Sequence, residues 1–300
     1  MGVWLVRVFQ FNPSHPKGKI MMTEKTQIAR WVMVALGFAI AVGFAATAAQ
    51  AGVINVPADK PTIQDAVDAA VSGDTILVAP GDYAGAWIEK TVQIVGSGPD
   101  TRITTGVGLY GDGLLVIGID AAGTEISNLA IEILGPDGGG VVLQAGFVPG
   151  LGWKGPDNCT VRDLKVTARW CGIYSELSDN VVVADNNISG TLQYGIWAQV
   201  VNSVSITNNT IQGEMWRAIA LNWAYDSVIS DNMMDRVISP PSHPWWNGAI
   251  DIDNGANNVV RGNQIMGEGR SAIHLFRTYN NSILDNDCSG YTGKWSGQSW

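Results

Sequence analysis

Two aspartates and a histidine near the C-terminal end are the residues best suited to chemistry in this 300-residue chain. Asp251 and Asp253 are separated by one isoleucine, and His274 follows 23 positions after Asp251. On a β-strand the two aspartate side chains would point to the same side, about 6.5–7 Å apart. Paired carboxylates at that separation can act as general acid and base, at the low end of the range for an inverting glycosidase. A nearby histidine could tune or relay a proton, because it titrates near neutral pH.

Aromatic, amide and basic residues that suit sugar binding accompany these positions. Two adjacent tryptophans directly precede the Asp251 segment, and large aromatic rings can form a wall against the face of a sugar. Arginines would bind carboxylates if the sugar polymer is acidic. The predicted substrate-binding residues are Trp197, Arg217, Asn222, Trp245, Trp246 and Arg270.

Metal and thiol chemistry are less well supported by the sequence, which predicts no cofactor. Asp251 and Asp253 are candidate ligands for Ca²⁺, but such a site takes six to eight oxygens. The three cysteines, Cys159, Cys171 and Cys288, lack the paired spacing of a zinc site. Their odd number also does not suit a disulfide framework. We therefore expect them to pack as small hydrophobic residues.

A repeat in the second half of the chain would position these side chains. A small residue followed by isoleucine recurs with steps of 23, 23, 31 and 23 residues. The isoleucines are Ile173, Ile196, Ile219, Ile250 and Ile273. Ten residues after each isoleucine a second pattern begins, in which a β-branched residue leads into Asp, Asn or Gly and a further aliphatic residue. Short alternating runs of this kind are typical of strands, and their strict period predicts a parallel β-helix with one coil per repeat.

The repeat also predicts which side chains are neighbours. If the isoleucines point inward, the residues that follow them point outward and stack from coil to coil about 4.8 Å apart. One predicted outward column contains Trp197, Ala220, Asp251 and His274, with Ala220 leaving a gap beside Asp251. The long step of 31 inserts a connection over residues 239–247, directly before the Asp251 strand. Loops on a rigid scaffold often carry function, so this connection and a second insertion at 147–157 are expected to wall a groove.

A column of asparagines supports the same register. Asparagine tolerates the left-handed backbone region and bonds to backbone groups at turns. Stacked at a corner, the amides would bond from coil to coil as a ladder. The column is Asn186, Asn209, Asn232, Asn263 and Asn286.

The N-terminal half is less regular and begins with a short amphipathic segment. Thr62 can cap a helix whose apolar side is formed by Ile63, Ala66, Val67 and Ala70. A solenoid needs its hydrophobic end closed, so this helix is predicted to cover the first coil.

The stretch that begins at Ile63, IQDAVDAAVSGDTILVAPGDYAGAWIEKTVQIVGSG, resembles the opening of right-handed parallel β-helix proteins of the pectin-lyase-like superfamily. It is similar to the starts of pectinesterases and of periplasmic copper-linked accessory β-helix proteins. With the later coils, the resemblance covers about residues 53–295. It implies the fold and does not settle an activity. The Asn-Thr-Asp, Asp-Asp, Gly-His-Gly and Arg-x-Lys motifs of β-helix polygalacturonases are absent, as are the Asp-Pro-His motif of alginate epimerases and any lyase signature.

The first 51 residues have the layout of a leader. The run from Trp31 to Ala49 carries no charge, follows Lys25 and Arg30, and ends in a small-x-small site, which predicts signal-peptide cleavage after Ala51. The alternative is a retained membrane anchor, since the run is long enough to span a bilayer. Five of the 18 basic and one of the 27 acidic residues precede Gly52, so the formal net charge of −9 becomes −13 in the remaining chain. This acidity argues against a nucleic-acid partner.

The sequence therefore predicts an all-β protein, a single-stranded right-handed parallel β-helix with coils of about 23 residues and an N-terminal capping helix. Residues 1–51 form the leader and 52–300 the β-helix domain, which ends inside a coil, so we expect either further coils or a dimer that covers that end. The predicted function is binding and cleavage of an extracellular polysaccharide, by a hydrolase or a lyase, in a secreted, periplasmic or cell-surface protein. The alternative is a non-catalytic surface or periplasmic scaffold. The substrate and the oligomeric state are left open.

Overall fold

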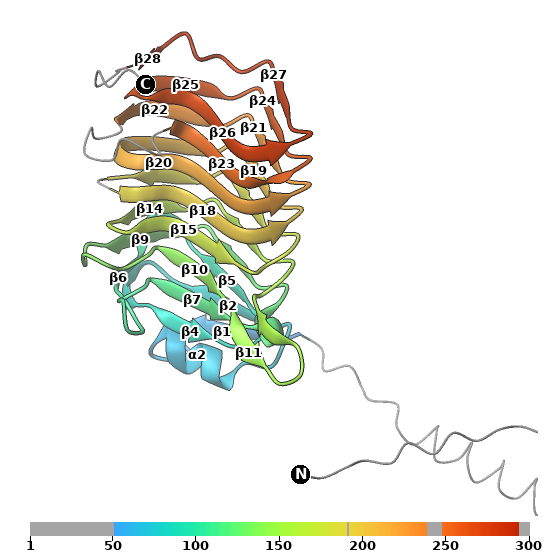
Figure 1. Cartoon of the computed structure of the whole chain (residues 1–300). Coiled ribbons are helices and arrows are strands. Elements are labelled where there is room, and N and C mark those ends of the chain that lie inside the picture. The colour runs from blue at the N-terminus through green and yellow to red at the C-terminus, as the bar shows by residue number, and fades with distance from the viewer. Residues whose placement is uncertain (1–50, 191, 239–247, 294–300) are drawn as a thin grey trace, which may run out of the picture. The chain divides into compact units, whose positions relative to one another are not determined.

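The computed structural model describes residues 51–190, 192–238 and 248–293, which form a stack of coils with a short helix across its first turns (Figure 1). These residues build three parallel sheets, here called A, B and C, and one antiparallel hairpin. Each coil contributes a strand to every sheet in the regular part, and each strand pairs with its counterpart in the next coil. This confirms the predicted parallel β-helix.

Sheet A contains the short strands in which the second sequence pattern begins. Its strands, in order, are β1 (Val53–Val56), β2 (Thr75–Val78), β5 (Gln93–Gly96), β8 (Glu125–Ser127), β13 (Thr160–Arg162), β16 (Val182–Ala184), β19 (Ser205–Thr207), β21 (Val228–Ser230), β24 (Val259–Arg261) and β27 (Ser282–Leu284).

Sheets B and C are joined through one long strand, β20 (Thr210–Tyr225), which pairs in both. Sheet B consists of β3 (Gly81–Ala84), β6 (Thr101–Thr105), β9 (Ala130–Ile133), β14 (Lys165–Ala168), β17 (Asn187–Ser189), the first part of β20, β22 (Met233–Ile238), β25 (Gln264–Gly269) and β28 (Tyr291–Gly293). Sheet C consists of β4 (Ala86–Ile88), β7 (Leu114–Ile117), β10 (Val141–Gln144), β15 (Cys171–Glu176), β18 (Leu192–Asn202), the second part of β20, β23 (Gly248–Ala256) and β26 (Ser271–Tyr279). The hairpin of β11 (Gly146–Val148) and β12 (Gly152–Lys154) and the 3₁₀ turn η1 (Ile119–Ala121) lie outside these sheets.

The helix α2 (Ile63–Ala69) packs against β1, β2 and β4. Its four predicted apolar residues are buried. The Thr62 hydroxyl accepts a hydrogen bond from the backbone N–H of Asp65 at 3.0 Å, which satisfies one of the N–H groups left unpaired at a helix start. The predicted N-terminal cap is thus confirmed.

The isoleucine column lies in the core of the solenoid. Ile173, Ile196, Ile219, Ile250 and Ile273 are paired in one register through β15, β18, β20, β23 and β26. The small residue before each isoleucine also faces the interior, because a Cβ on Gly172 would lie 2.5 Å from the Gly195 carbonyl oxygen and 2.7 Å from a methyl of Ile188. The repeated pair of a small residue and an isoleucine therefore marks a corner of the coil, where two successive residues both face the core. Cys159 and Cys171 are buried, and Cys288 packs partly buried against the core.

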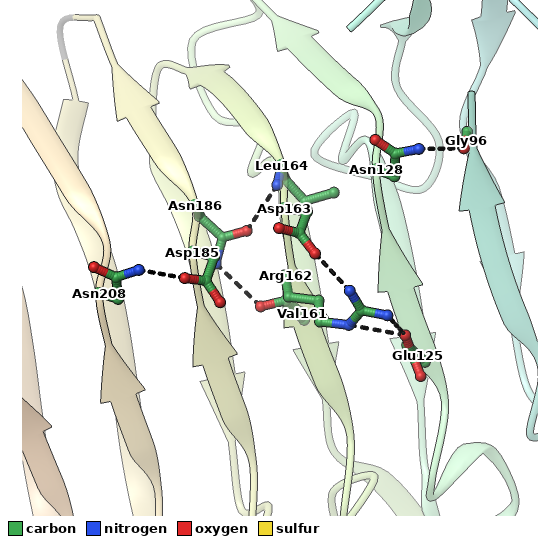
Figure 2. Close-up of polar contacts among 10 residues, drawn as sticks. All are labelled: Gly96, Glu125, Asn128, Val161, Arg162, Asp163, Leu164, Asp185, Asn186 and Asn208. Atoms are coloured by element: carbon green, nitrogen blue, oxygen red, sulfur yellow. Dashed lines mark hydrogen bonds and ion pairs between the residues drawn. The ribbon is translucent and has the colours of Figure 1, made fainter. Parts of the chain in front are cut away.

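The asparagine ladder is formed as predicted, at the corner between sheets A and B. Each side-chain amide donates to the next side-chain oxygen, at 2.9 Å from Asn186 to Asn209 and 2.8 Å from Asn263 to Asn286. Each oxygen also accepts from a backbone N–H of the preceding coil, and the ladder starts where Asn186 accepts from Leu164 N–H and donates to the Val161 carbonyl (Figure 2). The residue before each asparagine in the regular coils has a positive φ, which explains the Asp, Asn or Gly in the pattern.

The outer edge of the same corner carries exposed polar contacts. Arg162 bonds to Glu125 and Asp163, and Asn208 donates to Asp185 (Figure 2). A second, shorter ladder, in which Ser227 N–H donates to Asn258 and Asn258 donates to Asn281, lies at the corner between sheets C and A. This second ladder was not predicted from the sequence.

We expect Asn232→Ala to lower the free energy of unfolding by roughly 2–4 kcal/mol. Asn232 is buried, its side-chain oxygen accepts from both nitrogens of Asn209, and its amide donates to Ile206 and Asn263. Alanine would leave several of these buried groups unpaired. Urea unfolding measures the change, and Asn187→Ala, an exposed position on β17 with an ordinary backbone conformation, is the control with an expected change below about 0.5 kcal/mol. Equal losses in the two variants would contradict a stabilising ladder.

Candidate functional site

The outer side of sheet C brings the predicted catalytic residues together. Ala220 pairs with Asp251 and Asp251 with His274, as the repeat predicted. In the neighbouring column Asn222 pairs with Asp253, and Asp253 with Phe276. Strands β20, β23 and β26 therefore place two carboxylates, an imidazole and an amide on one surface.

Asp251 is the centre of a buried polar triad. Its Oδ2 lies 2.6 Å from Nε of Arg217, and its Oδ1 lies 2.9 Å from Nδ1 of His274. The contact between Arg217 and Asp251 is an ion pair. The side chain of Asp251 is 2% exposed, that of Arg217 11% and that of His274 26%. Of the three side chains, only the imidazole of His274 is exposed enough to contact a ligand.

Ala220 and Gly248 allow the triad to form. The gap predicted at Ala220 is not open, since Ala220 is fully buried between its paired neighbours Trp197 and Asp251. A Cβ on Gly248 would lie 2.9 Å from the Ile250 carbonyl oxygen and 3.1 Å from Cβ of His274, so glycine fits closely beside the His274 strand. Small residues thus let larger charged side chains pack closely on the outside of the coil.

The orientation of His274 follows from its partner. An ionised Asp251 requires the proton of a neutral imidazole to lie on Nδ1, which leaves Nε2 as an acceptor. The His274 ring also lies nearly parallel to that of Phe276, at a centroid distance of 6.3 Å and an angle of 12°. The imidazole is therefore held from two sides in an orientation suited to a general base.

Asp253 is the accessible carboxylate of the site. It is half-buried and accepts a hydrogen bond from the Asn254 amide at 2.9 Å. Burial, and next the negative charge of Asp251, raise the pKa of Asp253, while Arg277, Arg217 and His274 oppose this shift. Arg277 lies over the Phe276 ring, 4.9 Å from its centroid. A carboxyl group with a raised pKa retains its proton to higher pH, as a general acid must.

Trp197 belongs to an aromatic cluster rather than standing alone. Its ring stacks on Tyr194 at a centroid distance of 4.6 Å and contacts Tyr174 at 4.9 Å and Trp170 at 6.0 Å. Tyr194 also contacts Trp216 and accepts a hydrogen bond of 3.4 Å from Arg217. The cluster is a second apolar layer outside the solenoid, and it supports the Arg217 end of the triad.

Tyr194 is a site residue that the sequence analysis missed, although a signal was present. Tyr194 pairs with Arg217 on the neighbouring strand. Each of the two residues stands two positions before the column isoleucine of its own coil. The repeat therefore placed it beside an arginine already chosen as a candidate.

The remaining predicted residues are distributed differently. Arg270 is exposed directly before β26. Trp245 and Trp246 lie outside the described residues. The hairpin β11–β12, in which Phe147 and Trp153 pack edge to face, follows β10. Since β10 is four strands from β23, about 19 Å along the axis, this hairpin is not a wall beside Asp251.

A buried acid lies near the aromatic cluster. Asp112 is 4% exposed and accepts from Gly139 N–H at 2.8 Å, and burial raises its pKa. A carboxyl group whose pKa is raised by folding contributes fully to protein stability only below its unfolded-state pKa of about 3.9. That contribution is lost as the pH rises through the folded-state pKa, because the buried group then becomes charged. We expect Asp112→Asn to be more stable than the wild type at pH 7, by the order of 1 kcal/mol, because the buried charge is removed.

Urea unfolding of wild type and Asp112→Asn at neutral and acidic pH measures this effect. The advantage of the variant should disappear below about pH 4, where the wild-type carboxyl is protonated in both states. An advantage that does not change with pH would show that the charge of Asp112 is not its cause.

Within the three described ranges, no group of three or more His, Cys, Asp or Glu side chains is arranged to hold a metal ion. None of the helices in the described part of the chain is both long enough and apolar enough to cross a membrane.

Comparison with known proteins agrees with the right-handed parallel β-helix fold. Residues 149–294 match the family model described as a right-handed β-helix region. Among curated protein sequences, none matches this chain.

Solved structures of similar fold include polysaccharide-active β-helix enzymes. The enzymatically active domain of tailspike protein 2 from bacteriophage CBA120 is 13% identical with a TM-score of 0.51, over 77% of this chain and 40% of that one. The catalytic domain of a GH87 α-1,3-glucanase in complex with nigerose is 14% identical with a TM-score of 0.41, over 83% and 69% of the chains. The A-module of mannuronan C-5 epimerase AlgE4 from Azotobacter vinelandii is 13% identical with a TM-score of 0.32, over 82% and 97%. At these identities the likeness concerns the fold.

Proposed function

We propose that this protein hydrolyses glycosidic bonds of a polysaccharide on the outer side of sheet C. The observation that carries the proposal is the pairing of an oriented, partly exposed imidazole with a neighbouring carboxyl group of raised pKa. Aromatic and amide side chains flank these two groups on the same face. Such a face offers both the acid–base pair and the contacts that a glycan requires.

The strand positions of His274 and Asp253 support an inverting hydrolysis. They are diagonal neighbours, because the strand partner of His274 is Asp251 and that of Asp253 is Phe276. Diagonal positions on adjacent strands are about 7–8 Å apart at the backbone, which is of the same order as the roughly 6.5–9.5 Å between catalytic groups that leaves room for a water. Nε2 of His274 would take a proton from the water as its oxygen bonds to the anomeric carbon. The glycosidic bond would break as its oxygen takes the proton of Asp253.

This assignment changes one role expected from the sequence. Asp251 and Asp253 were the expected acid and base, with His274 as a helper. Because Asp251 is almost completely buried and both its oxygens face partners, we assign it to positioning His274. The acid and base are then Asp253 and His274.

A non-catalytic scaffold is the second candidate, and one observation favours it. The buried ion pair of Asp251 and Arg217 is equally consistent with a purely structural role on the outside of the solenoid. In that case the face would bind a glycan, or nothing, without turnover.

Incubation of the full chain with a panel of polysaccharides separates these functions. Hydrolysis releases new reducing ends without ultraviolet absorbance from unsaturated sugars, whereas elimination produces both. Proton NMR of the first product reports the anomeric configuration, and inversion is expected. Retention of configuration, or elimination, would overturn the roles proposed for His274 and Asp253, and no release from any polymer would favour the scaffold.

We also propose that the protein is secreted, to the periplasm or the cell surface. The uncharged run from Trp31 to Ala49 and the small-x-small site after it support this. Mass spectrometry of the exported protein should find an N-terminus at Gly52. An intact N-terminus in the exported protein would indicate a retained anchor instead.

A further inference from the structure

The arginines around the site already have partners within the protein. Arg217 is paired with Asp251 and lies against the ring of Tyr194, 5.6 Å from its centroid. Arg277 lies over Phe276, and its charge acts on Asp253. Arg270 is likewise not free. A ligand carboxylate would have to compete with these interactions.

The carboxylates of the same face equal the arginines in number. Glu176 and Asp253 are both partly exposed in one outward column. With Asp251, the face carries three carboxylates against Arg217, Arg270 and Arg277, a formal charge of 0 with His274 neutral. The chain as a whole is at −9. A polymer with a carboxylate on each sugar would find no surplus of positive charge on this face and would approach an acidic protein, which repels it.

Neutral hydrogen-bonding groups occupy the positions between the two accessible carboxylates. Gln199 pairs with Glu176 on one side and with Asn222 on the other, and Asn222 pairs with Asp253. Both amides are half-buried. An amide offers a donor and an acceptor at one position, which matches the hydroxyl groups of a neutral sugar.

From these contacts we infer that the site takes a neutral glycan rather than a polyuronate, with Gln199 and Asn222 binding sugar hydroxyls on one side of Asp253. This inference rests on the proposed function and names its substrate class. The glycan would lie along the solenoid axis, crossing β18, β20 and β23, because these groups follow one another from coil to coil.

Binding should be measured on the full chain carrying His274→Gln, which slows turnover and leaves every carboxylate and arginine in place. The probes are a soluble β-glucan, a soluble α-glucan and a galactomannan against polygalacturonate and alginate, each at low and high salt. We expect binding to a neutral polymer with little dependence on salt, and none to the two polyuronates. Gln199→Ala and Asn222→Ala should each weaken that binding about threefold to tenfold. Gln212→Ala, an amide on the sheet B part of β20, is the matched control and should not change it.

Each outcome separates the inference from the proposed function. Tighter binding of a polyuronate than of every neutral polymer overturns the inference, and its cleavage by the wild type would still leave a polysaccharide-processing enzyme. Binding of a neutral polymer that the wild type does not cleave keeps the inference and overturns the proposed hydrolysis. The inference is also overturned if no probe binds, or if the Gln212→Ala control loses as much binding as the Gln199→Ala and Asn222→Ala variants.

Discussion

Replacement of Asp251 by alanine is expected to lower the free energy of unfolding by about 3–5 kcal/mol. The variant would leave the Arg217 guanidinium, 11% exposed, without its carboxylate, and His274 without the acceptor at 2.9 Å. Removing one partner of a buried ion pair is costly because the other charge stays in a poorly solvated place. Urea unfolding followed by circular dichroism measures the loss.

A double-mutant cycle tests whether the pair itself is responsible. Arg217→Met keeps much of the buried volume and removes the charge, so the double variant Asp251→Ala/Arg217→Met should be more stable than the sum of the single losses predicts. Additive losses, within about 0.5 kcal/mol, would show that Asp251 and Arg217 are not coupled.

Replacement of Asp253 by asparagine is expected to reduce turnover by about 10²- to 10⁴-fold on any polysaccharide that the wild type cleaves. Asparagine keeps the size of the side chain and its contact with Asn254, but it has no acidic proton to give to the leaving oxygen. His274→Gln should show a loss of similar size, because it removes the base. Initial rates of reducing-end release measure both effects.

The pH dependence of the wild-type rate tests the role of Asp253 separately. Activity needs this carboxyl protonated, so the rate should fall on the alkaline side because Asp253 has lost its proton there; burial and Asp251 raise its pKa above the ordinary value and so extend the active range upward. Asp253→Asn should lose this limb. Glu132→Gln, an exposed carboxylate on β9 of sheet B, is the matched control and should keep the wild-type rate and profile. Wild-type rates in both Asp253→Asn and His274→Gln would contradict the roles assigned to these two residues.

Much of the fold could be predicted because the coils repeat. The spacing of Ile219 and Ile250 set the register between β20 and β23 despite the eight-residue insertion, and the structure has that register. The buried amides of Asn209 and Asn232 bond as the aligned column predicted. The capping helix was predicted from its apolar side and Thr62.

The candidate site was predicted less completely because exposure and packing on the outer face do not repeat. The register placed Asp251 beside His274, but nothing in the spacing indicated that Asp251 would be buried. Trp197 was expected to form part of a sugar platform, and its half-buried ring stacks on Tyr194. Ala220 was expected to leave a gap, and it is fully buried.

By itself, the sequence determined which residues share a column, because in-register parallel pairing relates each residue to the one a coil later, whatever its side chain. Only the tertiary structure decided which of those residues meet solvent. Arg217 reaches across from its own column to Asp251 in the next coil, and aromatic rings from successive coils close over one another. Such lateral contacts depend on side-chain size and direction, which a period along the chain does not encode. They bury Asp251 and leave Asp253 and His274 partly exposed.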